Sequence, residues 1–309
     1  MVGRVMPRPR SIAMKHGSVT KRLAGSRFRV LNEAFYTESS LQTQERLRAS
    51  PEEFMVYHKG YQEQVSKWEV NPIALFINLL ERVLAGSTEG EDGPGTITGA
   101  ASAGSAGIGL LDAELVQGLQ DLELRQSIKP SKVSKHQILL SFTGLTRKDI
   151  AVIGDMGCGE AALAQAIVPK YSPDVVVHSF DFVALNSYVT VANIRALPLE
   201  RHRLDLAIYC LSLMGSDYVT FIKEAFRVVR PGGELWLAEV NSRITNTKHL
   251  VELFSTCGFR KIKVITFTHF TLISFRRLED LEESHPNEKK RIDTTRYENC
   301  LAPCTYKRR

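Results

Sequence analysis

A glycine-rich turn, Asp155-Met-Gly-Cys-Gly-Glu160, is the feature that most limits what this chain can fold into. It follows the apolar run 150–153 and precedes the helix-like run 161–168. A strand, a glycine turn and a helix in this order form the first unit of a doubly wound α/β sheet, where glycines let the backbone approach a ligand closely. The turn therefore predicts that Gly157 and Gly159 border a binding site for a nucleotide-like cofactor.

The same alternation continues along the chain. The runs predicted as strands are 175–180, 204–210, 234–240, 261–267 and 271–275, and the runs predicted as helices are 218–229 and 248–257. Strands that alternate with helices indicate an α/β fold of the Rossmann type, with a mostly parallel sheet covered by helices on both faces. We place this cofactor-binding domain at residues 149–276.

Two cofactors fit the turn. Ala162 stands where a dinucleotide fingerprint has its third glycine, and Asp181 follows about 20 residues later, at a strand end suited to ribose hydroxyls. Asp155 favours one of them, because a carboxylate before the turn repels a pyrophosphate and suits the ammonium group of S-adenosylmethionine (SAM). A dinucleotide site and a purely structural turn are the alternatives.

The N-terminal part of the chain has a different character. Residues 23–85 are predicted to be helical, with helices starting near Pro51 and Pro72. The net charge is +6, and eight basic residues precede the first acidic residue, Glu33. We interpret 1–22 as a disordered basic tail. A solvated tail, an arm that meets polyanions and an organellar transit peptide are the three interpretations of this composition.

Two further segments lie outside the predicted folded parts, and the first of them is expected to carry no chemistry of its own. Residues 86–148 are interpreted as a Gly/Ser/Ala-rich insertion, mostly flexible, because eight of the 25 residues in 86–110 are glycine. Residues 277–309 are interpreted as a polar C-terminal tail.

Five cysteines without paired spacing suggest neither a metal site nor a disulfide framework. No apolar run approaches the roughly 20 residues of a membrane span, so no membrane association is expected.

Several blocks of the sequence resemble one family. They are Ala24-Gly-Ser-Arg-Phe-Arg-Val-Leu-Asn-Glu-Ala-Phe-Tyr-Thr37, Tyr57-His-Lys-Gly-Tyr-Gln-Glu-Gln-Val-Ser-Lys-Trp-Glu-Val-Asn-Pro72, the glycine turn, Ser179-Phe-Asp-Phe182, Tyr209-Cys-Leu-Ser-Leu-Met-Gly215, Val229-Arg-Pro-Gly-Gly233 and Ala238-Glu-Val-Asn-Ser-Arg243. Over 23–85 and 149–276 the chain is similar to the ribosomal RNA-processing protein 8 family, called nucleomethylin in animals. The resemblance implies a SAM-dependent enzyme of the nucleus and nucleolus that methylates N1 of an adenine in large-subunit ribosomal RNA. It also implies pre-ribosome or chromatin proteins as partners.

The resemblance assigns a set of cofactor contacts to the chain. They are His58, Gly157, Asp181, Asn193, Ile194 and Cys210, and Asp155 and Gly159 complete the set from the turn. His58 would reach the cofactor from the helical segment, Gly157 would lie against the methionine part, and Asp181 would bind the ribose. Asn193 and Ile194 would flank the adenine, and Cys210 would line the pocket. At Asn193-Ile194 the family has Asp-Met, and both changes keep an oxygen acceptor and an apolar surface.

The acceptor side is less defined. His269 and Phe270 are either core residues at a strand end or a stacking surface for an extruded base. Phe267 replaces an asparagine of the family, which affects base choice if that amide touches the target base. No catalytic residue is assigned, because N1 of adenine has a free lone pair and needs no general base. Deleting residues 1–30 is expected to weaken RNA binding and to spare SAM binding.

Two other functions remain open at this stage. One is a non-catalytic SAM-binding module in a chromatin or ribosome-assembly complex, and the other is a methyltransferase for another acceptor.

Overall fold

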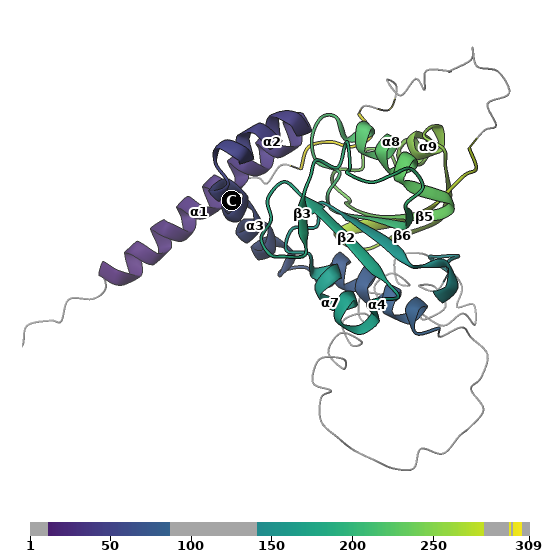
Figure 1. Cartoon of the computed structure of the whole chain (residues 1–309). Coiled ribbons are helices and arrows are strands. Elements are labelled where there is room, and N and C mark those ends of the chain that lie inside the picture. The colour runs from purple at the N-terminus through teal and green to yellow at the C-terminus, as the bar shows by residue number, and fades with distance from the viewer. Residues whose placement is uncertain (1–11, 87–140, 281–296, 298, 305–309) are drawn as a thin grey trace, which may run out of the picture.

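The computed structural model describes residues 12–86, 141–280, 297 and 299–304, with side chains from Leu23 onward (Figure 1). Residues 1–11 of the predicted tail, 87–140 of the predicted insertion and 281–296 of the predicted C-terminal tail lie outside the described residues.

Four helices form the N-terminal segment. They are α1 (Ile12–Thr37), α2 (Ser40–Ala49), α3 (Glu52–Val65) and α4 (Pro72–Leu84). Ser39 and Gln42 form a capping box at the start of α2, and the Asn71 side chain accepts a hydrogen bond from the backbone of Ile73 at the start of α4. The expectation of a disordered tail over 1–22 was wrong from Ile12 onward, because α1 begins there.

A seven-stranded sheet forms the body of the molecule. Its strands are β1 (Val152–Met156), β2 (Val176–Asp181), β3 (Val189–Val191), β4 (Leu204–Cys210), β5 (Val229–Val240), β6 (Phe259–Thr266) and β7 (Phe270–Arg277). The order is β3-β2-β1-β4-β5-β7-β6, with β7 antiparallel to both neighbours and the first five strands parallel. The predicted Rossmann-like sheet and its terminal strand pair are confirmed, and only the short β3 was not predicted.

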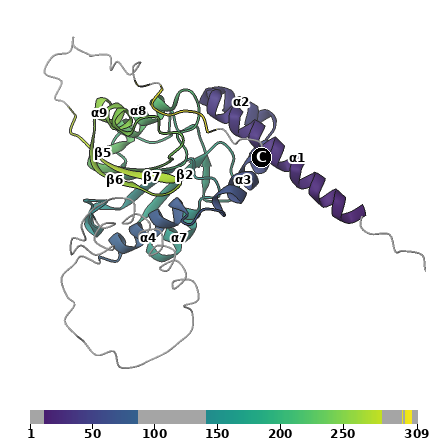
Figure 2. The same cartoon turned by 180° about the vertical axis from the view of Figure 1, so that it is seen from behind.

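Helices cover both faces of the sheet (Figures 1 and 2). Helices α4 and α7 (Ala162–Tyr171) lie on one face, and α8 (Tyr218–Val228) and α9 (Thr247–Thr256) lie on the other. Strand β4 illustrates the reason. Leu206 and Ile208 belong to the apolar core beneath α4 and α7, whereas Ala207 and Tyr209 belong to the core beneath α8 and α9. Successive side chains of a strand point to opposite faces, so a strand that is apolar throughout needs cover on both sides.

The end of the predicted insertion is packed, contrary to expectation. Phe142 is fully buried against Phe76 and Trp236, with ring centroids 6.2 and 5.8 Å away. The hydroxyl of Thr143 and the backbone N–H of Gly144 donate to the Glu234 carboxylate at 2.6 and 2.9 Å. These contacts fix the chain just before β1, so residues 141–148 belong to the folded domain.

Part of the predicted polar tail is also packed. Tyr297, Cys300, Leu301 and Cys304 are buried, and Leu301 forms a β-bridge with Ile244. The Asn32 side chain of α1 donates to the Cys304 carbonyl at 2.6 Å. The interpretation of 277–309 as a polar tail was therefore wrong over 299–304, which packs between α1 and the residues after β5.

No helix in the described part of the chain is long and apolar enough to cross a membrane.

Candidate cofactor site

A cavity of about 350 Å³ lies at the carboxyl ends of the central strands. Its floor is formed by the ends of β1, β2 and β4 and by the glycine turn, and its walls come from α1, α2 and α3. Strand order reverses between β1 and β4, and this switch point is where doubly wound sheets bind ligands. The N-terminal helices turn that open crevice into a cavity.

The two glycines of the turn make room for neighbouring side chains. Gly157 and Gly159 have φ angles of +72° and +57°, in the left-handed region that glycine adopts without strain. A Cβ on Gly157 would lie 2.5 Å from Cβ of Ser212, and a Cβ on Gly159 would lie 2.3 Å from Cε1 of His58. Both positions therefore require glycine for conformation and for space, although the space is taken by neighbouring side chains of the protein and the predicted ligand contact stays a prediction.

Two carboxyl groups beside the turn influence each other electrostatically. Asp155 is 2% exposed, and burial, reinforced by the nearby Asp181, raises its pKa to about 7. Desolvation likewise raises the pKa of Asp181 to about 6, although its two oxygens accept from the backbone N–H groups of Gly159 and Phe182, both at 2.7 Å. No lysine or arginine among the described residues lines this cavity. The site is therefore suited to a ligand that brings its own positive charge.

His58 lines the cavity from α3, and its contact with a cofactor stays a prediction. Its ring packs edge-on against Phe54 and Tyr61, with centroids 4.7 and 6.0 Å away. Burial lowers the pKa of His58, and the opposing effect of Glu160 is smaller. The imidazole is therefore neutral at neutral pH, with one ring nitrogen able to donate and the other able to accept.

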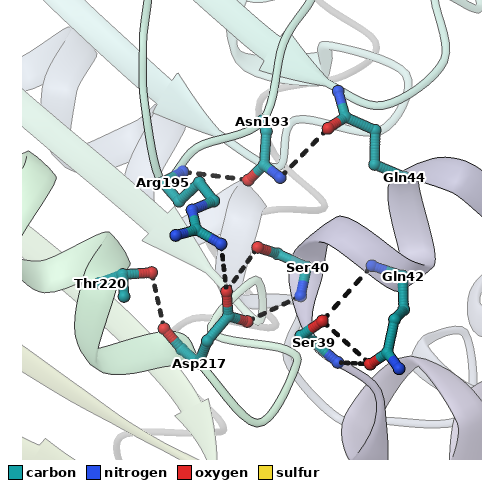
Figure 3. A network of polar contacts seen from close by, with 8 residues as sticks. All are labelled: Ser39, Ser40, Gln42, Gln44, Asn193, Arg195, Asp217 and Thr220. Atoms are coloured by element: carbon teal, nitrogen blue, oxygen red, sulfur yellow. Dashed lines mark hydrogen bonds and ion pairs between the residues drawn. The ribbon is translucent and has the colours of Figure 1, made fainter.

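The predicted adenine-flanking pair is split. Ile194 lines the cavity, as does Cys210, whose thiol pKa is raised by burial. The Asn193 side chain is directed elsewhere: its Oδ1 accepts from the backbone N–H of Arg195 at 3.1 Å, and its Nδ2 donates to Gln44 of α2 at 3.4 Å (Figure 3). Asn193 thus joins the sheet domain to α2 and is not part of the cavity wall.

The two residues proposed to contact a base lie away from the cavity wall. Phe270 is 1% exposed and stacks on Phe267 and Trp68, so its ring is a core group and offers no face to a base. His269 lies flat on Trp68, with ring centroids 5.4 Å apart and planes within 6°. The structure shows this pair packed at the end of a strand, which was the other interpretation of His269 and Phe270.

Sequence reasoning missed the cavity walls from α1 and α2. Phe35, Thr43 and Leu47 line the cavity there, opposite the residues of the sheet. The capping box at Ser39 and Gln42 is a local signal that would have located α2. Thr43 and Ser212 line this cavity, and their hydroxyl oxygens are buried without a hydrogen-bond partner in the described structure. Such groups are rare in proteins, and a bound molecule is one explanation for those that line a cavity.

No group of three or more His, Cys, Asp or Glu side chains within the described residues could hold a metal ion.

Most of the chain matches one protein family. A family model described as a hypothetical methyltransferase matches residues 15–97 and 125–309. The chain belongs to this family. The match resumes at residue 125, so the segment that departs from the family is 98–124 and not the whole of 86–148.

Its relatives include named ribosomal RNA enzymes. The chain is 31% identical to the 25S rRNA (adenine(645)-N(1))-methyltransferase of Saccharomyces cerevisiae over 93% of its length and 70% of that protein. It is 30% identical to Ribosomal RNA-processing protein 8 of Caenorhabditis elegans, and 31% identical to the rat protein of that name, in each case over 94% of the chain. The chain spans 62% and 47% of those two proteins.

Solved structures overlap only with part of the chain. A Burkholderia thailandensis 1,6-didemethyltoxoflavin-N1-methyltransferase with bound S-adenosylhomocysteine (SAH) shares 16% identity over 59% of this chain and 94% of that one, at a TM-score of 0.38. A 16S rRNA (adenine(1408)-N(1))-methyltransferase from Catenulisporales acidiphilia shares 12% over 42% of this chain and 87% of that one, at 0.35. The assignment of the fold therefore depends on the strand order and the family match.

Proposed function

We propose that this protein is a SAM-dependent methyltransferase that methylates N1 of an adenine in large-subunit ribosomal RNA. The observation that carries the proposal is a single cavity lined both by the glycine turn and by polar residues at the junction of α3 and α4. One end of such a cavity suits the methyl donor and the other an acceptor. The name of the yeast relative, an rRNA adenine-N1-methyltransferase, supplies the acceptor class.

The residues that line the cavity near the glycine turn fit the separate chemical groups of SAM. The carboxylates of Asp155 and Asp181 suit a ligand that carries an ammonium and a sulfonium charge. Both Asp181 oxygens keep a free lone pair beyond their backbone donors, so they can also accept from ribose hydroxyls. Ile194 and Phe182 provide apolar surface for the adenine ring. Asn193, in contrast, is proposed to support the site indirectly, by holding α2 in place through its hydrogen bond to Gln44.

The acceptor is proposed to enter between α3 and the start of α4. This acceptor wall is formed by Tyr61, Gln62, Ser66, Asn71 and Ile73. It contains an aromatic ring, two amides and a hydroxyl, which are the groups that read the edge and face of an unpaired base. It replaces His269 and Phe270 in that role, because the ring of Phe270 is enclosed in the core.

The chemistry asks little of the protein beyond alignment. SAM supplies an activated methyl group, and N1 of adenine carries a lone pair that is free at neutral pH. The enzyme must therefore hold the nucleophile in line with the methyl group and exclude water. N1 is engaged in a Watson–Crick pair inside a duplex, so the base must be unpaired or extruded before it can enter.

RNA affinity is proposed to come from phosphate contacts along α1. Helix α1 projects beyond the body of the molecule (Figure 1), and the segment 1–60 carries eleven basic and five acidic residues. Phosphate contacts make binding fall with salt, with a log K slope of about −0.7 per contact on single strands. Truncation at residue 30 is unsuitable as a test, because Phe28 is buried and stacks on Tyr57 at 5.7 Å, beside His58. Removal of 1–22 keeps that packing.

The decisive experiment is methyl transfer from labelled SAM to unmodified large-subunit ribosomal RNA, followed by nucleoside analysis. Label in N1-methyladenosine, absent with Gly157→Arg, would support the proposal. SAH binding without transfer to RNA would favour a non-catalytic SAM-binding module, and label in another nucleoside or in protein would favour another acceptor. A tagged protein is expected in the nucleolus with pre-ribosomal particles, and exclusion from the nucleus would contradict that part.

A further inference from the structure

Helix α2 closes the cavity on the side of Ile194, and it carries a buried hydroxyl there. Thr43 is 5% exposed and lines the cavity, yet its Oγ1 has no hydrogen-bond partner among the described residues. We propose that the Thr43 hydroxyl binds the adenosine half of the cofactor, so that α2 forms part of the cofactor site. This inference rests on the proposed use of SAM.

The missing hydrogen-bond partner is informative because a threonine in a helix normally has an acceptor within reach. The hydroxyl of a threonine inside a helix commonly bonds to the carbonyl one turn back. The backbone N–H of Thr43 does bond to the Ser39 carbonyl at 3.0 Å, but no such bond forms from the side chain in the described structure. A buried hydroxyl without a partner costs free energy that a ligand atom recovers on binding.

The position of Thr43 points to the adenosine half. Gln44, the next residue, accepts the hydrogen bond from Asn193, and Ile194 follows Asn193 into the cavity wall (Figure 3). Asp181 and Phe182, at the end of β2, also line the cavity. If Asp181 holds the ribose, the adenine lies on the side of Phe182 and Ile194, where α2 provides the wall. Adenine nitrogens and ribose oxygens can accept from Oγ1, and the amino or hydroxyl groups of adenosine can donate to it.

A second set of bonds holds α2 in this position. The backbone N–H and the hydroxyl of Ser40 donate to the two oxygens of Asp217 at 2.7 and 2.6 Å. Arg195 approaches the same carboxylate at 3.4 Å (Figure 3). Asp217 stands at the N-cap position of α8, but its side chain makes no capping bond to α8 in the described structure. Its carboxylate instead anchors the first turn of α2.

The backbone adds a third anchor next to this one. Ser216 donates its N–H to the Glu38 carbonyl at 2.9 Å, just before α2 begins. Helix α2 is therefore fixed at its start by the 215–217 loop and near its middle by Asn193. A hydroxyl fixed in this way loses little conformational entropy when it meets a ligand, which makes its contribution to affinity measurable.

The test compares cofactor affinity in variants of the full chain by titration calorimetry, with SAH and 5′-methylthioadenosine as probes. Thr43→Val keeps the shape and removes the hydroxyl, and Thr43→Ser keeps the hydroxyl. We expect Thr43→Val to weaken both probes by about 3- to 10-fold, the equivalent of one neutral hydrogen bond, and Thr43→Ser to bind like wild type. Thr43→Ala, which favours the helix, is the second variant if Thr43→Val has a lower melting temperature.

Ser274→Ala is the matched control. Ser274 is fully buried on β7 with an unpartnered hydroxyl, like Thr43, but it does not line the cavity. Its loss should leave both affinities unchanged. The inference fails if Thr43→Val and Thr43→Ala bind SAH like wild type, or if they weaken SAH but not 5′-methylthioadenosine, since the hydroxyl would then face the amino-acid half. Absence of SAH binding by the wild type would overturn the proposed function itself, which is a different outcome.

Discussion

The imidazole of His58 occupies the space that a side chain on Gly159 would need, with Cε1 2.3 Å from the position of a Cβ atom there. His58 belongs to α3, whereas Gly159 belongs to the turn after β1. The N-terminal helices therefore dock directly on the cofactor turn and complete the site. The helical segment and the α/β sheet together line one cavity.

Gly159→Ala tests this contact. The added methyl group must displace His58, so SAH affinity should fall by at least tenfold in titration calorimetry. Gly86→Ala is the control, because Gly86 also has a left-handed φ, +71°, but nothing lies within 4 Å of a Cβ there. Both variants should lose about 1 kcal/mol of stability from backbone strain, Gly159→Ala should lose more because His58 must also move, and only Gly159→Ala should lose affinity. Equal affinities would mean that His58 moves aside freely.

The sequence allowed the glycine turn that borders the cavity to be predicted, but not the helices that form the cavity walls. Gly157, Gly159 and Asp155 follow from a local pattern, because strand, turn and helix are adjacent in the chain. The contribution of α2 could not be predicted in this way, because Thr43 and Ile194 line the same cavity only after two segments about 150 residues apart have packed together. Asn193 shows the same limit: a family position placed it by the adenine, but its amide bonds to Gln44.

The buried carboxyl of Asp155 should make both stability and cofactor binding depend on pH. Its pKa is about 7 in the folded protein and about 4 in an unfolded chain. Between these values the folded state holds a proton that the unfolded state has lost, so the stability of the free protein should fall as pH rises from 4 to 7. The ionised form suits the ammonium of SAM, so SAH affinity should rise over pH 6 to 8.

Asp155→Asn isolates this effect from its neighbours. Asp181 titrates near the same range, and His58, whose pKa is lowered by burial, has the opposite influence on stability. The difference in melting temperature between wild type and variant should therefore be compared across pH, with and without SAH. The variant should bind SAH about 10- to 100-fold more weakly at pH 8, where wild type offers a charge-assisted bond, and with little pH dependence. A wild-type affinity that does not change between pH 6 and 8 would contradict this role.

The acceptor wall gives a prediction that separates substrate from cofactor. Gln62 and Asn71 line the cavity beside Tyr61, but Asn71 also caps α4 through Oδ1. Gln62→Ala should therefore lower methyl transfer to RNA by about tenfold and leave SAH affinity within twofold. Gln64→Ala, two residues along the same helix and outside the cavity lining, is the control. Equal transfer rates for the two variants would remove Gln62 from the acceptor wall.

The 267–270 turn should matter for folding and not for base contact. Phe270 is enclosed between Phe267 and Trp68, so Phe270→Ala should lower the free energy of unfolding by about 3–5 kcal/mol in urea denaturation. His269→Ala, which removes only the outer partner of Trp68, should cost about 1 kcal/mol. If His269→Ala instead abolished RNA methylation at unchanged stability and SAH affinity, the base-stacking interpretation would be restored.

The two segments expected to be unstructured show why sequence patterns fail there. Residues 141–148 and 299–304 are short and contain no α-helix or strand, so no periodicity reports their burial. Thr143 and Gly144 are fixed by Glu234, and Ala302 is fixed by Arg243. Each anchor is distant in the chain and belongs to the sheet or its border. Polar composition predicted a tail, whereas long-range hydrogen bonds to a buried charge made it part of the fold.

The buried ion pair of Arg243 and Glu239 holds the C-terminal segment to the body of the molecule. Both side chains are nearly inaccessible, at 2% and 0%. Arg243 also donates to the carbonyls of Ala302 and Leu213, both at 2.9 Å, and its guanidinium lies 4.2 Å from the ring centre of Tyr36. One side chain thus joins α1, the end of β5, the residues after β4 and the 299–304 segment.

Arg243→Met should lower the free energy of unfolding by about 3–5 kcal/mol, because it leaves the Glu239 carboxylate buried and unpaired. Adding Glu239→Gln removes that charge and should recover most of the loss, although residues 299–304 should still exchange amide hydrogens faster than in wild type. Lys248→Met is the control: its side chain is 82% exposed and 4.0 Å from Glu252, and its loss should cost less than about 1 kcal/mol. A double variant as unstable as Arg243→Met alone would show that the bonds to the C-terminal segment, and not the unpaired charge, account for the loss.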